Sequence, residues 1–268
     1  MFGFGYKVYN SKRGTSGVSL NPVVQSFVDD NGISNTTEIN ALNRMYVNLT
    51  TLVNSHGGSV LYLNGVSPTS YAASKKAIIY GTGNQTAIEI SGTPTHSTDG
   101  IFFDSTSKAW NVGTIIPNLY QDEIMLITQR YSNTSVNGVA SGYNYALADQ
   151  IQLSLNGLSG SSGFNQPNNY TGFAFNLAGQ YISYNNGTTY GIWKSGIFQT
   201  PTSTYAPVHT LEGTRDFYIS GRNQSGSLLN GIGERLSTYC AIHDGGTLFN
   251  STQIQEISDI INAYNLAV

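Results

Sequence analysis

Charged residues are scarce in this sequence. Asp, Glu, Lys and Arg together make up 10% of the 268 residues, against roughly 25% in a typical soluble domain. The formal net charge is −3, so the chain has no excess of basic side chains that would attract a phosphate backbone. The composition therefore argues against a nucleic acid partner. Solubility has to come from uncharged polar residues.

Cysteine and long apolar runs are also nearly missing. The one cysteine, Cys240, cannot form an internal disulfide, and we expect it to be a small buried apolar side chain. No apolar run approaches the roughly 20 residues that span a bilayer, so no membrane insertion is expected. The first 14 residues lack the basic head and apolar core of a signal peptide. A composition typical of proteins that act outside cells, without an export signal, predicts location in a virion.

Glycine and aromatic residues are abundant, with 30 glycines, 18 tyrosines and an aromatic share of 12%. A hydrophobic share of 39% is enough for a core. Short apolar segments bounded by turn residues recur at spacings of about 8–12 residues, which predicts an all-β sandwich. These segments are residues 59–65, 76–81, 86–92, 100–105, 109–113, 123–131, 150–157, 173–179, 180–187 and 189–198.

Two segments have the period of a short helix instead. The first begins after Asn35, an expected N-cap, with Glu38 placed to complete a capping box, and it ends at His56. The second begins after Asn250, with Gln253 as the reciprocal partner. Apolar residues recur three or four positions apart in both, at Ile39, Leu42, Met45 and Leu49, and at Ile254, Ile257, Ile261 and Tyr264.

Residues 31–268 are expected to form a single domain. Residues 1–30 are expected to be an N-terminal arm or an edge strand, because Phe2, Phe4 and Tyr6 alternate there without a longer pattern. The last strand before the terminal helix is expected to present one apolar face. Its members are Leu236, Thr238, Cys240 and Ile242.

Residue patterns of catalysis are missing. Glycoside hydrolases place two carboxylates on one cleft, but Asp122 and Glu123 are adjacent and would point to opposite faces of a strand. Glu212 and Asp216 lie at a junction between a loop and a strand, where solvated carboxylates are ordinary. The four histidines have neither zinc-site nor catalytic-triad spacing. We therefore expect no catalytic residue and a protein that is not an enzyme.

The candidate calcium ligands are Asp29, Asp30 and Asn31, whose carboxylate and amide oxygens suit Ca²⁺. A complete calcium loop would need more acidic residues than surround them. We therefore expect no cofactor, with a calcium site at these three residues as the alternative.

The candidate glycan-binding stretch contains Tyr181, Tyr184, Asn186, Tyr190 and Trp193. Flat aromatic faces suit the C–H side of a sugar, and amide groups suit its hydroxyls; Tyr and Trp are also rigid anchors. Aromatic residues that alternate along a strand are, however, often core residues or cross-strand pairs. Both interpretations stay open at this stage.

Several segments resemble one family when taken together. They are the helix from Asn35, THSTDGIFFD at Thr95–Asp104, YISGRN at Tyr218–Asn223, and YCAIHDGGTL at Tyr239–Leu248 followed by the terminal helix. In this order they resemble the concanavalin A-like, laminin G-like jelly-roll modules of bacteriophage tail fibres and related virion appendages. The resemblance implies a jelly-roll sandwich with two short helices, one near each end of the chain.

The same resemblance implies a function. It is that of a tail-fibre, head-fibre or spike component whose lectin-like module serves assembly and host attachment through cell-surface carbohydrate. Expected partners are other virion proteins and further copies of the chain, in a homo-oligomer such as a trimer. The alternatives are a glycoside hydrolase on the same fold and a purely structural decoration protein, since fold alone does not decide function.

Overall fold

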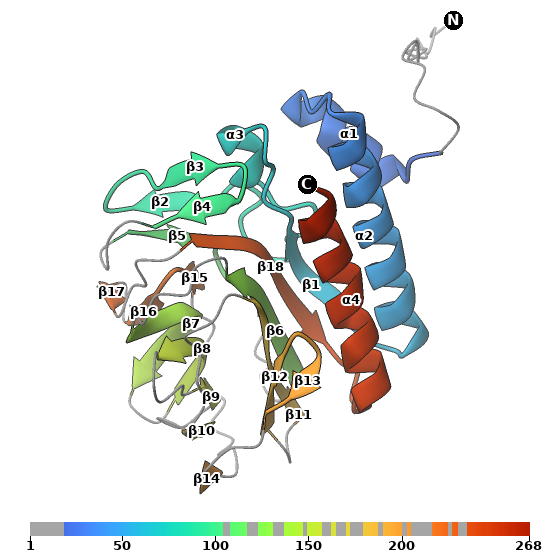
Figure 1. Cartoon of the computed structure of the whole chain (residues 1–268). Coiled ribbons are helices and arrows are strands. Elements are labelled where there is room, and N and C mark those ends of the chain that lie inside the picture. The colour runs from blue at the N-terminus through green and yellow to red at the C-terminus, as the bar shows by residue number, and fades with distance from the viewer. Residues whose placement is uncertain are drawn as a thin grey trace, which may run out of the picture.

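The computed structural model has three layers, in which two β-sheets pack face to face and helices cover the outer face of one of them (Figure 1). The described residues are 19–103, 108–116, 123–130, 137–146, 149–156, 162–164, 170–171, 179–186, 190–199, 203–204, 216–224, 227–229 and 235–268. The helices in these ranges are too short or too polar to cross a bilayer. The predicted all-β sandwich, with helices near both ends of the chain, is confirmed.

The central sheet has the strand order β13–β12–β11–β6–β18–β4–β3, and β1 also pairs with β18. Its strands are β1 (Ser59–Asn64), β3 (Thr95–Ser97), β4 (Gly100–Phe102), β6 (Glu123–Arg130), β11 (Gly179–Asn186), β12 (Tyr190–Lys194), β13 (Ile197–Phe198) and β18 (Arg235–His243). These pairings are antiparallel. Asn185 lies opposite Tyr190, so β11 and β12 form an antiparallel pair of strands that are neighbours in the sequence.

The outer sheet has the order β17–β16–β7–β15–β5–β2, with β8 pairing to β7 and β9 to β8. Its strands are β2 (Ile88–Ile90), β5 (Ala109–Asn111), β7 (Asn137–Ala146), β8 (Asp149–Asn156), β9 (Ser162–Phe164), β15 (Tyr218–Ile219), β16 (Arg222–Gln224) and β17 (Ser227–Leu229). Separate from it, β10 (Tyr170–Thr171) pairs with β14 (Ser203–Thr204). Strand β2 lies at one end of the outer sheet, where the candidate site is found.

The central sheet is buried on both faces. In β6, Ile124 and Leu126 belong to the core between the two sheets, whereas Met125 and Ile127 belong to the core beneath the helices. Successive side chains of a strand point to opposite faces. Burial of both faces therefore explains why β6 reads as a continuous apolar run rather than an alternating one.

The helical layer follows the predicted caps. The side chain of Asn35 accepts hydrogen bonds at the start of α2 (Thr36–Ser55), and α4 (Ser251–Ala267) begins with the capping box of Asn250 and Gln253. Glu38 does not complete a box, because its carboxylate turns away to accept a hydrogen bond from Thr69 at 2.8 Å. Helices α2 and α4 lie side by side over the central sheet (Figure 1).

A further helix, α1 (Pro22–Asn31), lies where an arm or an edge strand was expected. Asn21 caps its start, Gly32 ends it at a φ of 62°, and its buried residues join the core beneath the helices. These residues are Val24, Phe27 and Val28. The domain boundary expected at residue 30 therefore falls inside α1. The alternating Phe2, Phe4 and Tyr6 lie outside the described residues.

Strand β18 does not present the single apolar face that the sequence predicts, because the strand contains a β-bulge. The pairing with β6 shifts register between Ser237 and Tyr239, and one extra residue turns all following side chains to the other face. As a result Leu236 faces the core between the sheets, whereas Cys240 and Ile242 face the helices. Cys240 is fully buried, as expected, and burial raises the pKa of its thiol.

Candidate functional site

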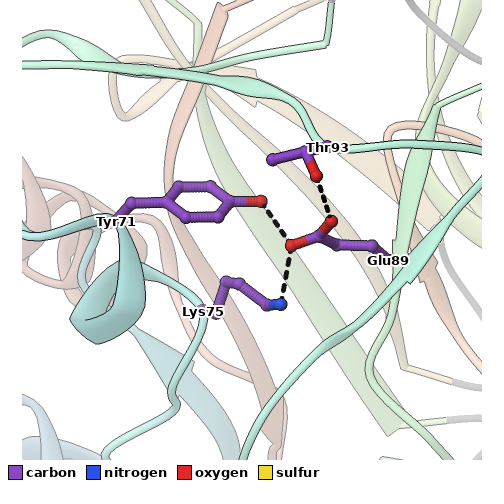
Figure 2. Close-up of polar contacts among 4 residues, drawn as sticks. All are labelled: Tyr71, Lys75, Glu89 and Thr93. Atoms are coloured by element: carbon purple, nitrogen blue, oxygen red, sulfur yellow. Dashed lines mark hydrogen bonds and ion pairs between the residues drawn. The ribbon is translucent and has the colours of Figure 1, made fainter.

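Four polar side chains from separate segments meet beside β2, and we call them the Glu89 cluster. Tyr71 opens the short helix α3 (Tyr71–Ser74), Lys75 follows it, Glu89 lies in β2, and Thr93 follows β2. Figure 2 shows the other three side chains directed at the Glu89 carboxylate.

Local hydrogen bonds hold these segments together. Ser70 caps α3 by accepting from the backbone N–H of Ala73, at 3.2 Å. The N–H of Ala87 donates to the carbonyl oxygen of Lys75 at 2.8 Å, and Lys76 forms a β-bridge with Thr86. The backbone after α3 is therefore fixed against the strand that carries Glu89.

The Glu89 carboxylate accepts three side-chain hydrogen bonds. Lys75 Nζ and Tyr71 Oη donate to Oε1 at 2.7 and 2.8 Å, and Thr93 Oγ1 donates to Oε2 at 2.6 Å. The Lys75 and Glu89 side chains are 22% and 21% exposed, and Thr93 is exposed. The ion pair is therefore ordered but still reachable from solvent.

These bonds set the charges of the cluster. Hydrogen bonds from Lys75 and then Thr93 lower the pKa of Glu89 to about 2, against the opposing effect of burial. Burial raises the pKa of Tyr71, and its hydrogen bond to Glu89 raises it further. At neutral pH Glu89 is therefore a carboxylate and Tyr71 a protonated phenol. Such fixed groups suit ligand recognition through hydrogen bonds.

Aromatic rings support the cluster from one side. The Tyr71 ring centroid lies 6.0 Å from that of His96 and 6.3 Å from that of Trp110, a residue of the core between the sheets. His96 Nε2 donates to the carbonyl oxygen of Ser67 at 2.7 Å. Tyr71 is thus anchored to the sandwich core, and this anchoring limits the movement of its hydroxyl.

The five candidate glycan-binding residues do not form one surface. Tyr181 is fully buried in the core between the sheets, and Tyr184 is buried on the opposite face of β11, in the core beneath the helices. The Tyr184 hydroxyl donates to buried Asp244 and accepts from the backbone N–H of Phe249 at 3.1 Å. Both rings therefore have packing roles, the alternative that the sequence left open.

The other three candidates lie in β11 and in β12, the strand that pairs with the edge strand β13 of the central sheet. Trp193 is half-buried and meets the exposed Phe198 edge-on, with ring centroids 5.3 Å apart. Asn186 and Tyr190 end β11 and begin β12, and their side chains lie outside the described part of the structure. Of the five candidates, Trp193 is thus the one whose described side chain reaches solvent.

The candidate calcium ligands lie on the last turns of α1 and bond to different groups. Asp29 accepts from Gln25 at 2.9 Å, and Asn31 donates to the carbonyl oxygen of Phe27 at 2.7 Å. Asp30 faces Ser26 at 3.4 Å. The three do not converge as a calcium loop requires. Within the described ranges no group of three or more His, Cys, Asp or Glu side chains could hold a metal ion.

The Glu89 cluster was not predicted from the sequence. Its members come from three segments, and each looks like an ordinary turn or strand residue on its own. One weak signal was present, because Glu89 is an acidic residue between Ile88 and Ile90 in a chain with few charges. Its partners Lys75 and Tyr71 could be found only from the fold.

Comparisons with known proteins support the fold. No protein-family model matches the sequence, and no match is found among curated proteins. Among solved structures, a mutant Trypanosoma rangeli sialidase with trans-sialidase activity is similar, with a TM-score of 0.53 and 12% identity over 84% of this chain and 39% of that one. The Trypanosoma rangeli sialidase in complex with sialic acid gives 0.52 and 10%, over 75% and 33%.

A third structure is the CBM40 module of the Ruminococcus gnavus IT-sialidase, and the match to it covers 96% of that module and 64% of this chain. Its TM-score of 0.40 and its identity of 11% are too low to carry an argument. This chain spans only one third to two fifths of the length of the two sialidases above. At such identities the likeness establishes the fold, a concanavalin A-like type of β-sandwich.

The comparisons also correct one expectation. From the sequence we expected a protein that is not an enzyme, but two solved structures that share this fold, with TM-scores of 0.53 and 0.52, are sialidases. That expectation is therefore wrong. It rested on the missing carboxylate pattern, and enzymes with the same fold show that this fold is compatible with catalysis.

Proposed function

We propose that this chain recognises carbohydrate and that the Glu89 cluster is the contact site. The observation that carries the proposal is the ionised Glu89 carboxylate, held by Tyr71, Lys75 and Thr93 and still partly exposed. Sugars are recognised through hydroxyl groups, each of which both donates and accepts hydrogen bonds. A site that offers fixed donors and acceptors side by side suits such groups.

The shared fold supports the same proposal. The similar Trypanosoma rangeli structure is a sialidase solved with sialic acid, so a sandwich of this type occurs in a protein that handles a saccharide. We therefore propose glycoside hydrolysis as the second candidate function, with this chain forming all or part of a carbohydrate-active protein. The likeness covers 33% of that sialidase, so the hydrolase proposal needs its own test.

We also propose the more specific features that the sequence predicts. They are a virion location, a bacteriophage fibre or spike with laminin G-like modules, host attachment through surface glycans, and a homo-oligomer with virion partners. Immunogold labelling of purified particles tests the location, and light scattering at micromolar concentration tests the oligomer. Label found only on host material, or a monomer in solution, would remove the corresponding proposal.

The carbohydrate proposal is tested by glycan-array binding, followed by calorimetry with the best oligosaccharide. Glu89→Gln should weaken binding by about tenfold or more, because a hydrogen bond to a charged group contributes roughly 1.5–3 kcal/mol. The matched control is Glu256→Gln, a change of the same kind on the exposed face of α4. If the wild-type protein binds no glycan, or if the two variants bind the oligosaccharide equally well, the proposed site is refuted.

Hydrolysis is followed in the same samples. Release of reducing ends or of free sialic acid by the wild-type protein would establish the enzymatic alternative. Thermal unfolding of each variant shows whether a lost activity reflects a lost fold. Product formation that persists in Glu89→Gln with unchanged stability would place the chemistry elsewhere in the chain.

A further inference from the structure

We infer that the Glu89 cluster selects neutral saccharides with adjacent hydroxyl groups over acidic saccharides such as sialic acid. The inference rests on the proposed function and specifies its ligand class. It differs from what the similar sialidase structure would lead one to expect, because that enzyme was solved with an acidic sugar. Three features of the cluster carry it.

The first feature is charge. Lys75 is the one cation within the cluster, and its ammonium lies 2.7 Å from the Glu89 carboxylate. Lys75 Nζ also lies 5.7 Å from the centre of the Tyr71 ring. The nearby Lys108 side chain lies along Gly92 and already has an interaction of its own. The positive charge that an acidic sugar needs is therefore already matched by Glu89.

The second feature is the hydrogen-bonding capacity that remains. An ammonium has three donors, and Lys75 uses one of them on Glu89. A carboxylate accepts about four hydrogen bonds, and Glu89 receives three from the cluster. Two donors on Lys75 and one acceptor site on Glu89 thus remain for a ligand, on two groups that lie 2.7 Å apart. Two adjacent hydroxyls can use both, one as acceptor and the other as donor.

The third feature is the chemistry of the exposed oxygens. Thr93 and Tyr71 both donate their hydroxyl protons to Glu89, so their oxygens keep lone pairs but have no proton left for a ligand. A ligand carboxylate has only acceptor oxygens and would meet these atoms and the Glu89 charge without a proton to offer. A ligand hydroxyl brings its own proton. The cluster is thus unfavourable to an anion and favourable to a polyol.

The test compares two oligosaccharides that differ only in a terminal sialic acid, measured by calorimetry at low and physiological salt. The wild-type protein should bind the neutral member at least about tenfold more tightly, since like-charge juxtaposition in a site costs more than one factor of ten. The preference should shrink as salt rises, because exposed charges are screened. Glu256→Gln should leave the ratio unchanged.

Glu89→Gln removes the negative charge and releases Lys75. This variant should bind the neutral sugar about tenfold more weakly and the acidic sugar more tightly, so that the ratio of the two affinities falls or reverses. The second variant is Thr93→Val, at an exposed position. It should weaken the binding of the neutral sugar and leave the binding of the acidic sugar unchanged. Should Glu89→Gln fail to fold, this variant decides.

Two failures are distinguishable. Equal or tighter wild-type binding of the sialylated member, lost in Glu89→Gln, would overturn the selectivity and leave the proposed carbohydrate site standing. Binding of neither sugar, with no hit on the glycan array, would overturn the proposed function and this inference together.

Discussion

Truncation of one buried isoleucine tests whether the terminal helix closes the fold. Ile257 lies in the middle of α4, is fully buried, and belongs to the core shared by the helices and the central sheet. Ile257→Ala should lower the free energy of unfolding by about 2–5 kcal/mol, because it removes buried carbon atoms and leaves a cavity. Alanine is the better helix former, but that gain is below about 0.7 kcal/mol.

The same helix provides the matched control. Leu266 is 80% exposed, so Leu266→Ala should change the free energy of unfolding by about 0.5 kcal/mol or less. Total stabilities are roughly 5–15 kcal/mol, so the buried change should remove a large fraction of the total. For a chain of this size about 1 kcal/mol corresponds to roughly 2–4 °C in Tm.

The assay is thermal unfolding together with urea titration, on both variants and the wild-type protein. A Tm decrease of about 4–20 °C for Ile257→Ala, with Leu266→Ala near the wild-type value, is the expected result. Equal shifts in the two variants would mean that α4 is not docked on the sheet. The description of a helix-covered central sheet would then be wrong.

Two further predictions concern buried and half-buried polar groups. Glu89 has a pKa of about 2 in the fold, below its ordinary 4.5, so it stabilises the fold above about pH 4.5, and this contribution is lost as the pH falls toward 2. The free energy of unfolding, measured by urea titration, should therefore fall between pH 6 and pH 3 in the wild-type protein, and Glu89→Gln should reduce that fall by roughly 1 kcal/mol after allowance for solvent screening. Tyr184→Phe removes the hydroxyl that joins Asp244 to the Phe249 backbone and should cost roughly 1.5–3 kcal/mol, whereas Tyr80→Phe, at a side chain that is 39% exposed, should cost little. A flat pH profile in the wild-type protein, or equal losses in the two tyrosine variants, would contradict these assignments.

Local signals were sufficient for the two predicted helices. Asn35 and Asn250 both act as N-caps, because a cap depends on a side chain and its own next turn. Helix α1 had signals as well, an Asn-Pro start and Gly32 at its end, but its three apolar positions were too few to establish a period. The bulge in β18 has no such signal, because the partner strand β6 determines it.

The site was less predictable than the fold. Tyr184 and Trp193 share a tyrosine-rich hairpin, and nothing in that pattern distinguishes a ring beneath a helix from one at a sheet edge. Glu89 and Lys75 become partners only because a β-bridge aligns their segments. Contacts of this kind depend on packing between distant parts of the chain, which local propensity does not encode.

The pairing of β1 with β18 has a consequence for synthesis on the ribosome. Ser59 lies opposite His243, so most of the chain separates two neighbouring strands. During translation β1 and α2 are made well before the strand and the helix that cover them, β18 and α4. The apolar face of α2 therefore stays exposed until β18 and α4 have been made, and folding that depends on such distant contacts is slow and prone to aggregation. Synthesis of β18 and α4, rather than of the elements that precede them, is thus the event that permits this sandwich to fold.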